Sequence, residues 1–486
     1  MRSSAAGSAA SPRHRFAFAA LATAGTAVAL MQTMVAPALP VLQREYHTSP
    51  AGVTWVLTIY LLVASVATPL LGRLGDMFGK DRMLMIVLTA TAAGTVLCAV
   101  AGSLELVVLG RAVQGSSAVV FPLAFGILRD ELPRHRLNWS IGLISATYGI
   151  GSAGGVVLGG LVVDRAGTSW MFWSMLPLIV ISAVMVHVVV PQSPARVRCP
   201  IDWIGGLLLS VGLAAILLAI SESGTWGWLS APTVVLLAGG MLVLVVFAWY
   251  EQQASEPLLD MRVMRSRAVW TTNLTAVISG FGMFASLLLI PQLVQIPRSA
   301  GFGFGASVLQ AGLFLLPSAA AMLVCAPIAG LAAARYGGRA PLLAGIVLVG
   351  LSFAELALLH SKSWEILLSS LLAGAGLGLS TASMASVIVD AVPASQTAVA
   401  TGMNAIMRTT GGALNSQVTA SILGAHTVVL GGLPREHAFV IASVVACVAL
   451  AFGALAALLI PDAPASRVCR VPVSLVPAGQ ASETSI

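Results

Sequence analysis

The segment Gly72–Arg82 reads GRLGDMFGKDR, a short charged run between two long apolar stretches. A weaker copy, Gly330–Arg339, reads GLAAARYGGR and also lies between apolar stretches. Its first glycine stands 258 residues after the first glycine of the charged run, at position 330 against position 72. A copy at this distance indicates two related halves, as in many membrane proteins that are built from repeats.

The composition around the charged run excludes an ordinary soluble domain. Hydrophobic residues make up 58% of the 486 residues and charged residues only 9%, against about 25% charged in a soluble protein. A spanning helix needs about 20 mostly apolar residues, and fourteen such stretches follow one another between Phe16 and Ile460. The sequence therefore predicts an all-α integral membrane protein with fourteen transmembrane helices.

The distance between the two copies is longer than six spans require, and the surplus fits two inserted spans. The predicted organisation is therefore six helices, two inserted helices and six more helices. The expected boundaries are an N-terminal tail over 1–15, a first half over 16–190, two inserted helices with their loops over 191–268, a second half over 269–460 and a C-terminal tail over 461–486.

The basic residues predict the orientation. With both termini in the cytoplasm, eighteen of the 25 lysines and arginines fall in inner segments, five in outer loops and two inside spans. This distribution follows the positive-inside rule. The net charge of +7 is thus explained by topology, and we expect no binding to nucleic acid.

Three motifs in order along the chain resemble one family. Gly72–Arg82 resembles the signature loop of the major facilitator superfamily, G-x-L-[AG]-D-R-x-G-[RK]-[RK], with Met77 in place of its first arginine. Leu109–Gly115, LGRAVQG, resembles the motif of span 4. Gly151–Gly160, GSAGGVVLGG, is similar to the antiporter motif of span 5, with Val156 in place of its proline. Trp170–Pro177, WMFWSMLP, at the start of span 6 is also typical of the branch of fourteen-span drug:proton antiporters.

The resemblance implies proton-coupled export of amphipathic small molecules by alternating access, in the inner membrane of a bacterium. Drug or antibiotic efflux is the expected role, and self-resistance of an antibiotic producer is one form of it. The chain carries no phosphate-binding GxxxxGK[ST] loop, so we expect no ATPase activity of its own. We also expect no enzyme activity, cofactor or metal site, and a monomer. Two alternatives stay open: a transporter of a physiological metabolite, and a membrane sensor that transports nothing.

The resemblance also assigns roles to two groups of residues. It implies a conformational latch in the charged run, formed by Gly72, Asp76, Gly79, Lys80 and Arg82. It implies gating by glycines that leave one face of span 5 nearly bare, and we expect this face to pack against the other half. These glycines are Gly151, Gly155, Gly159 and Gly160.

Two arginines stand inside apolar spans. A charge at the centre of a span costs at least ~2.5–3.5 kcal/mol, so Arg111 and Arg408 should face the interior of the bundle. Gln114 is three residues from Arg111, and Asn404 is four residues from Arg408, so each pair shares a helix face. We expect these four residues to line a cavity or to take part in proton coupling.

Span 1 lacks the acidic residue that this branch of the family usually has. Met31 stands at the position of the acid in span 1, and its neighbour Gln32 is a candidate for hydrogen bonding to cargo. Glu355 is the remaining candidate for a proton site inside the membrane. Because the spans hold two arginines and no central acid, we predict a cargo that is neutral, zwitterionic or anionic.

Overall fold

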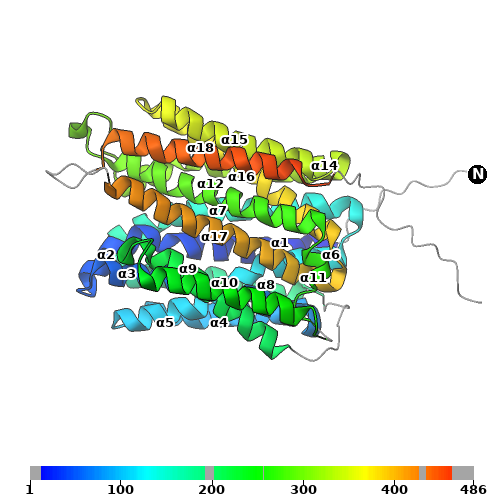
Figure 1. Cartoon of the computed structure of the whole chain (residues 1–486). Helices are drawn as coiled ribbons and strands as arrows, with labels where there is room; N and C mark the ends of the chain where they lie inside the picture. The colour runs from blue at the N-terminus through cyan, green and yellow to red at the C-terminus, as the bar shows by residue number, and fades with distance from the viewer. Residues whose placement is uncertain (1–11, 192–201, 255–256, 426–433, 462–486) are drawn as a thin grey trace, which may run out of the picture.

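The computed structural model describes residues 12–191, 202–254, 257–425 and 434–461, and these residues form a bundle of long helices (Figure 1). Of the predicted tails over 1–15 and 461–486, residues 1–11 and 462–486 lie outside these ranges, and residues 12–15 belong to the first helix. The first helices are α1 (Pro12–Met34), α2 (Leu39–Glu45), α3 (Pro50–Phe78), α4 (Lys80–Ala99), α5 (Leu104–Gly115), α6 (Val120–Glu131), α7 (Arg134–Ala166) and α8 (Thr168–Val189).

The region predicted to be inserted and the second set of helices follow. The predicted inserted region holds α9 (Trp203–Trp226), α10 (Ala231–Glu251) and the short α11 (Met261–Met264). The second set is α12 (Arg267–Gln295), α13 (Val308–Phe314), α14 (Leu316–Tyr336), α15 (Arg339–Leu358), α16 (Ser363–Ala391), α17 (Thr397–Ala425) and α18 (Glu436–Leu458).

Thirteen segments of the described chain are long and apolar enough to cross a membrane. The fourteenth predicted span lies in α17, which has 29 residues and is therefore long enough. It is not among the thirteen, because polar side chains such as Asn404, Arg408 and Asn415 interrupt its apolar sequence. The chain thus has the predicted all-helical membrane fold, with one helix more polar than a span that faces lipid.

Most of the charged run is helical, and a single residue separates two helices. Helix α3 continues to Phe78 and α4 begins at Lys80, so Gly79 alone joins them, with a φ of 112° that favours glycine. Gly72 lies inside α3. In the copy, Gly337 with a φ of 84° follows the end of α14. We call the end of the bundle that carries Gly79 and Gly337 the inner end.

The packing shows which helices separate the two sets. Helix α7 packs against both α1 and α14, and α17 packs against both α12 and α3. Helices α9 and α10 form a pair, and α9 also contacts α3 and α17. In Figure 1, α12, α15, α16 and α18 lie on one side of the bundle, α3, α4 and α5 on the other, and α17 between them. The surfaces of α7 and α17 therefore border the space between the sets.

Candidate functional site

A pocket lies between the two sets of helices, in a space of about 500 Å³ that includes volume open to solvent. From the first set, α6 contributes Phe121 and Phe125 and α7 contributes Tyr148. The Phe121 ring meets the Tyr148 ring edge-on at 5.5 Å between centroids. The remaining lining residues are Pro122, Ser145, Met322, Thr381, Ala385, Thr401, Asn404, Ala405 and Arg408. Aromatic rings thus form one wall and α17 the other.

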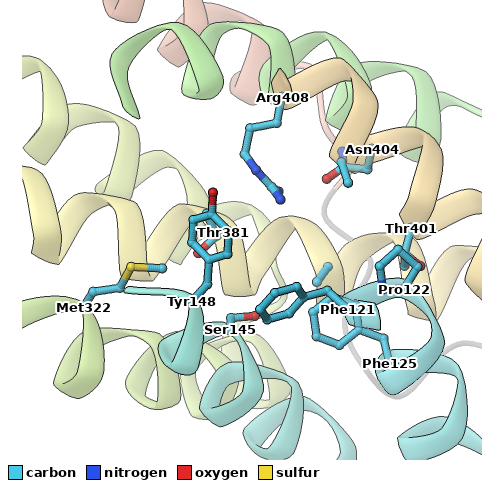
Figure 2. A pocket seen from close by; sticks show the side chains of 12 residues that line it. Phe121, Pro122, Phe125, Ser145, Tyr148, Met322, Thr381, Thr401, Asn404 and Arg408 are labelled. Carbon is cyan, nitrogen blue, oxygen red and sulfur yellow. The ribbon is translucent and has the colours of Figure 1, made fainter. Parts of the chain in front are cut away.

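Arg408 is the only charged side chain among the residues that line this pocket. Figure 2 shows Arg408 and Tyr148 extending toward one another from opposite walls. Asn404, one turn earlier on α17, donates to the Asn273 side chain at 3.1 Å and so is held against α12. The prediction that Asn404 and Arg408 share a face toward a cavity agrees with this arrangement, and the cavity offers a cation with no acid beside it.

A second pocket of about 500 Å³ adjoins the first. Tyr148 and Met322 line both pockets, so these two side chains stand at the boundary between them. The lining of the second pocket includes hydroxyls and apolar groups but no charged side chain, for example Ser152, Ser286 and Ser318. Helices α7, α14 and α16 contribute residues to both pockets, and α12 lines the second.

Arg111 lies elsewhere, enclosed within the first set of helices and fully buried. Its Nε donates to the Val56 carbonyl at 3.2 Å and its Nη1 to the Gln114 side chain at 2.8 Å. The guanidinium also stands over the Tyr60 ring, 4.4 Å from the centroid, a cation–π arrangement. Gln114 in turn donates to Thr95 at 2.9 Å. Arg111 and Gln114 therefore share a face as predicted, but neither lines the two pockets.

The unusual Met31 lies at the end of this network. The Thr95 hydroxyl lies 3.9 Å from the Met31 sulfur, so the residue that replaces the acid of the branch still faces the Arg111 network. Its neighbour Gln32 accepts a hydrogen bond of 3.4 Å from Tyr148 and thereby contacts a residue that lines the central pocket. Glu355 is half-buried near the end of α15, away from both pockets.

A buried ion cluster forms the inner junction of the two sets. The Lys80 Nζ lies 2.8 Å from the Asp130 carboxylate and 3.4 Å from the Asp76 carboxylate. Asp76 accepts a hydrogen bond of 3.4 Å from the backbone N–H of Val399, at the start of α17. Gly126 on α6 gives the Lys80 stem room, because a Cβ there would lie 2.6 Å from Lys80 Cδ. Carboxylate and helix N-terminus thus join α3 to α17.

The other predicted latch residues are placed differently. Gly72 packs on the backbone of α17, where a Cβ would lie 3.2 Å from the Ala398 carbonyl. Arg82 is exposed. Arg129, which was not among the predicted latch residues, also reaches the start of α17: it donates to the Thr397 hydroxyl and the Val392 carbonyl, both at 2.7 Å. Its only signal in the sequence is the Arg129-Asp130-Glu131 triplet that ends a span.

The glycines of span 5 face a partner other than the expected one. A Cβ on Gly151 would lie 2.8 Å from the Thr26 carbonyl, and Gly155 and Gly159 likewise face α1 backbone. Gly160 is buried. For Gly151, Gly155 and Gly159 the expectation of packing against the other half is therefore wrong, because their spacing of four residues places them on the α1 side of α7.

A different pair of glycines on α7 meets the other set of helices. A Cβ on Gly142 would overlap the Ala326 carbonyl, and one on Gly149 would overlap the Met322 sulfur.

Cys98, Cys325 and Cys447 are free thiols, whereas Cys199 and Cys469 lie outside the described residues. No group of three potential metal ligands occurs in the part of the chain that the structure describes.

Comparisons with known proteins agree with this architecture. The model of the Major Facilitator Superfamily matches residues 21–415 and 272–479. The tetracenomycin C resistance and export protein of Streptomyces glaucescens is 29% identical over 82% of this chain and 73% of its own length. Multidrug resistance protein Stp of Mycobacterium tuberculosis is 29% identical over 80% of this chain and 72% of its own.

A solved structure shows the same fold. The human organic anion transporter MFSD10 (TETRAN) superposes with a TM-score of 0.65, covering 93% of this chain and 100% of its own, at 14% identity. At that identity the likeness concerns the fold alone. The helices, the pocket between two sets and the family match lead to one conclusion: this chain is a multi-pass transporter of the cell membrane that belongs to the major facilitator superfamily.

Proposed function

We propose that this protein exports amphipathic small molecules that are neutral, zwitterionic or anionic, in exchange for protons and by alternating access. The observation that carries the proposal is the central pocket, where Arg408 faces an aromatic wall and no acid accompanies it. Arg408 is half-buried, and a cation withdrawn from water is costly unless it is paired, so an anionic or electron-rich group of the cargo would be a fitting partner in this pocket. The two halves that move are 16–190 and 269–460.

The relatives support the efflux role. One is named for resistance to tetracenomycin C and its export, and another for multidrug resistance. Antibiotic efflux, including self-resistance of a producing organism, is therefore the role that we propose. In this scheme the cluster around Asp76 and Lys80 holds the inner end closed while the cargo leaves on the other side.

Transport into everted membrane vesicles would test the proposal. Vesicles with an imposed pH gradient would receive three matched fluorescent probes: an aromatic carboxylate, its neutral amide and a cationic amine of the same ring. We expect uptake of the carboxylate and the amide, and loss of this uptake when the gradient is dissipated. A strict preference for the cationic amine would contradict the proposal.

Substitutions at Arg408 connect the result to the pocket. Arg408→Gln should reduce uptake of the carboxylate by about tenfold or more, since a charge-assisted hydrogen bond contributes ~1.5–3 kcal/mol and ~1.4 kcal/mol corresponds to a factor of ten. Arg408→Lys should keep part of the uptake. Arg335→Gln, at an exposed position at the inner end of α14, is the matched control and should transport all probes as the native protein does.

Two further outcomes separate the alternatives. An unchanged drug susceptibility of a deletion strain, together with altered secretion of a cellular metabolite, would favour a metabolite transporter. Absence of flux for every probe, by protein that is folded in the membrane, would favour a sensor.

A further inference from the structure

Two carboxylates, which do not line the central pocket, meet at the inner end of α9 and α10. Asp202 caps α9: its Oδ1 accepts from the Gly205 N–H at 2.8 Å and from the Tyr250 hydroxyl at 3.2 Å. Glu251 is the last residue of α10 and is only 2% exposed. Its Oε2 accepts from the Leu259 N–H at 3.2 Å. Each carboxylate is thus fixed through one of its oxygens.

The other oxygen of each carboxylate has no such partner. Asp202 Oδ2 and Glu251 Oε1 are buried and accept no hydrogen bond from the described residues. Both lie 2.5 Å from the position that a Cβ on Gly205 would occupy, so they can be no more than about 5 Å apart. A buried acceptor without a donor costs ~1–3 kcal/mol, and more when it is charged. A single hydrogen-bond donor placed between the two oxygens would therefore satisfy both of them.

Several charged groups of the described chain surround the pair. From α3, Arg73 acts electrostatically on Glu251, as the weakest of the influences on that carboxylate. Asp260, Arg262 and Arg265 line a pocket next to Glu251, and the Asp260 carboxylate accepts from the Arg262 N–H. No described hydrogen bond links the guanidinium groups of these arginines to the two unpartnered oxygens.

We propose that Asp202 and Glu251 hold one proton between them, as a carboxylic acid that donates to the facing carboxylate. One proton supplies the donor for both unpartnered oxygens and removes the second negative charge. Two like-charged carboxylates at this separation cannot both ionise at low cost, since each disfavours the charged form of the other. This site goes beyond the proposed export function, because it lies outside the cargo pocket.

The position of the pair connects it to the inner junction. Gly206 of α9 packs on α3, where a Cβ would lie 2.9 Å from Leu70. Leu209 and Phe247 of the inserted helices share an apolar cluster with Val399 of α17, the residue whose N–H donates to Asp76. Loss of the proton would leave two negative carboxylates that repel one another beside this cluster. The packing of α9 and α10 against α3 and α17 would therefore depend on the pH of the cytoplasm.

Infrared spectroscopy of the purified full-length protein tests the proposal directly. The carbonyl stretch of a protonated carboxylic acid would be followed across a pH series in Asp202→Asn, Glu251→Gln and the native protein. Asn remains a good helix cap and Gln is nearly isosteric with Glu, so both variants should fold. Glu222→Gln is the matched control, because Glu222 stands at the opposite end of α9 in an exposed hydrogen bond with Thr225.

A shared proton makes a specific prediction. The native protein and Glu222→Gln should show the same protonated band at neutral pH, and either single substitution in the pair should remove the whole of one proton's band. A band that both substitutions leave unchanged would overturn the proposal. So would a band that sodium ions displace at constant pH, which would indicate a cation site. Because the measurement needs no transport, absent flux with an intact band would overturn the export function alone.

Discussion

The two inner crossings of the bundle, α3 over α17 and α14 over α7, occupy equivalent places in the two copies of the repeat. At the first crossing Asp76, Lys80 and Asp130 form a buried ion cluster that reaches the α17 backbone. The second crossing has Ala334 and Gly338 at the positions that correspond to Asp76 and Lys80 by the offset of 258 residues. There the helices meet through bare backbone, with Gly330 against Asn138.

The difference shows that the same helix geometry is held in two ways. The charged crossing depends on a balance of buried charges, each of which is costly alone. The bare crossing depends on the absence of side chains, which lets the backbones approach closely. We therefore expect the charged crossing to lose stability when a charge is removed, and the bare crossing to lose stability when an atom is added.

The largest effect is expected at the centre of the charged crossing. Lys80→Met would leave the buried carboxylates of Asp76 and Asp130 without their cation, and breaking a buried pair in this way costs ~3–5 kcal/mol. We expect the variant to accumulate poorly and to unfold at a clearly lower temperature in detergent. The double variant Lys80→Met with Asp76→Asn should recover part of the stability, and a Lys80→Met protein as stable as the native one would contradict the charge balance.

A smaller effect is expected from single methyl groups at the two crossings. Gly330→Ala would push a Cβ into the Asn138 carbonyl, whereas Gly72→Ala would stand 3.2 Å from the Ala398 carbonyl. Overpacking costs ~1–3 kcal/mol, so Gly330→Ala should lower the unfolding temperature more than Gly72→Ala does. Equal losses would show that the bare crossing is no more tightly packed than the charged one.

Arg129 extends the charged crossing, and its removal should weaken that crossing alone. Arg129→Gln would lose the two hydrogen bonds to Val392 and Thr397, which contribute ~1.5–3 kcal/mol each when one partner is charged. Part of this is regained from water, since Arg129 is only partly buried. We expect faster opening of the inner end, measured as faster labelling of a cysteine introduced at Thr401. Unchanged labelling would argue against a role in closure.

The smallest effect is expected nearer the outer ends of α3 and α17, where α9 lies between these two helices. The Ser221 carbonyl accepts from Gln417 of α17 at 2.9 Å, and the Ser221 hydroxyl lies 3.2 Å from that of Thr58 on α3. Gln417→Leu and Thr58→Val should each cost ~0.5–1.5 kcal/mol, as neutral hydrogen bonds do. Distance measurements between spin labels on α3 and α17 should show the outer ends further apart on average; an unchanged distance would remove α9 from this role.

The sequence predicted the helices well because most membrane spans follow from length and hydrophobicity, and α17 with its polar side chains departs from that rule. The repeat is visible as a fixed offset, and in the structure Gly79 and Gly337 stand in equivalent turns. It could not decide which neighbour the glycines of α7 would meet: Gly151 and Gly142 differ only in which side of the helix they occupy, and their partners are far away in the sequence. The contacts of Arg129 could not be predicted either, and it stood only among the inner basic residues. The groups that accept its hydrogen bonds are 263 and 268 residues away in the sequence.

The polar character of α17 has a consequence for how the protein is made. As α17 leaves the ribosome, its own sequence provides a weak signal for release into lipid, because a central arginine is unfavourable there. Its partner α12 has been synthesised earlier, and the backbones of the two helices approach closely, with Gly280 against Arg408 and Gly411 against Val277. The insertion of α17 should therefore depend on α12 waiting beside the translocation channel, which makes these small contact residues determinants of biogenesis as well as of packing.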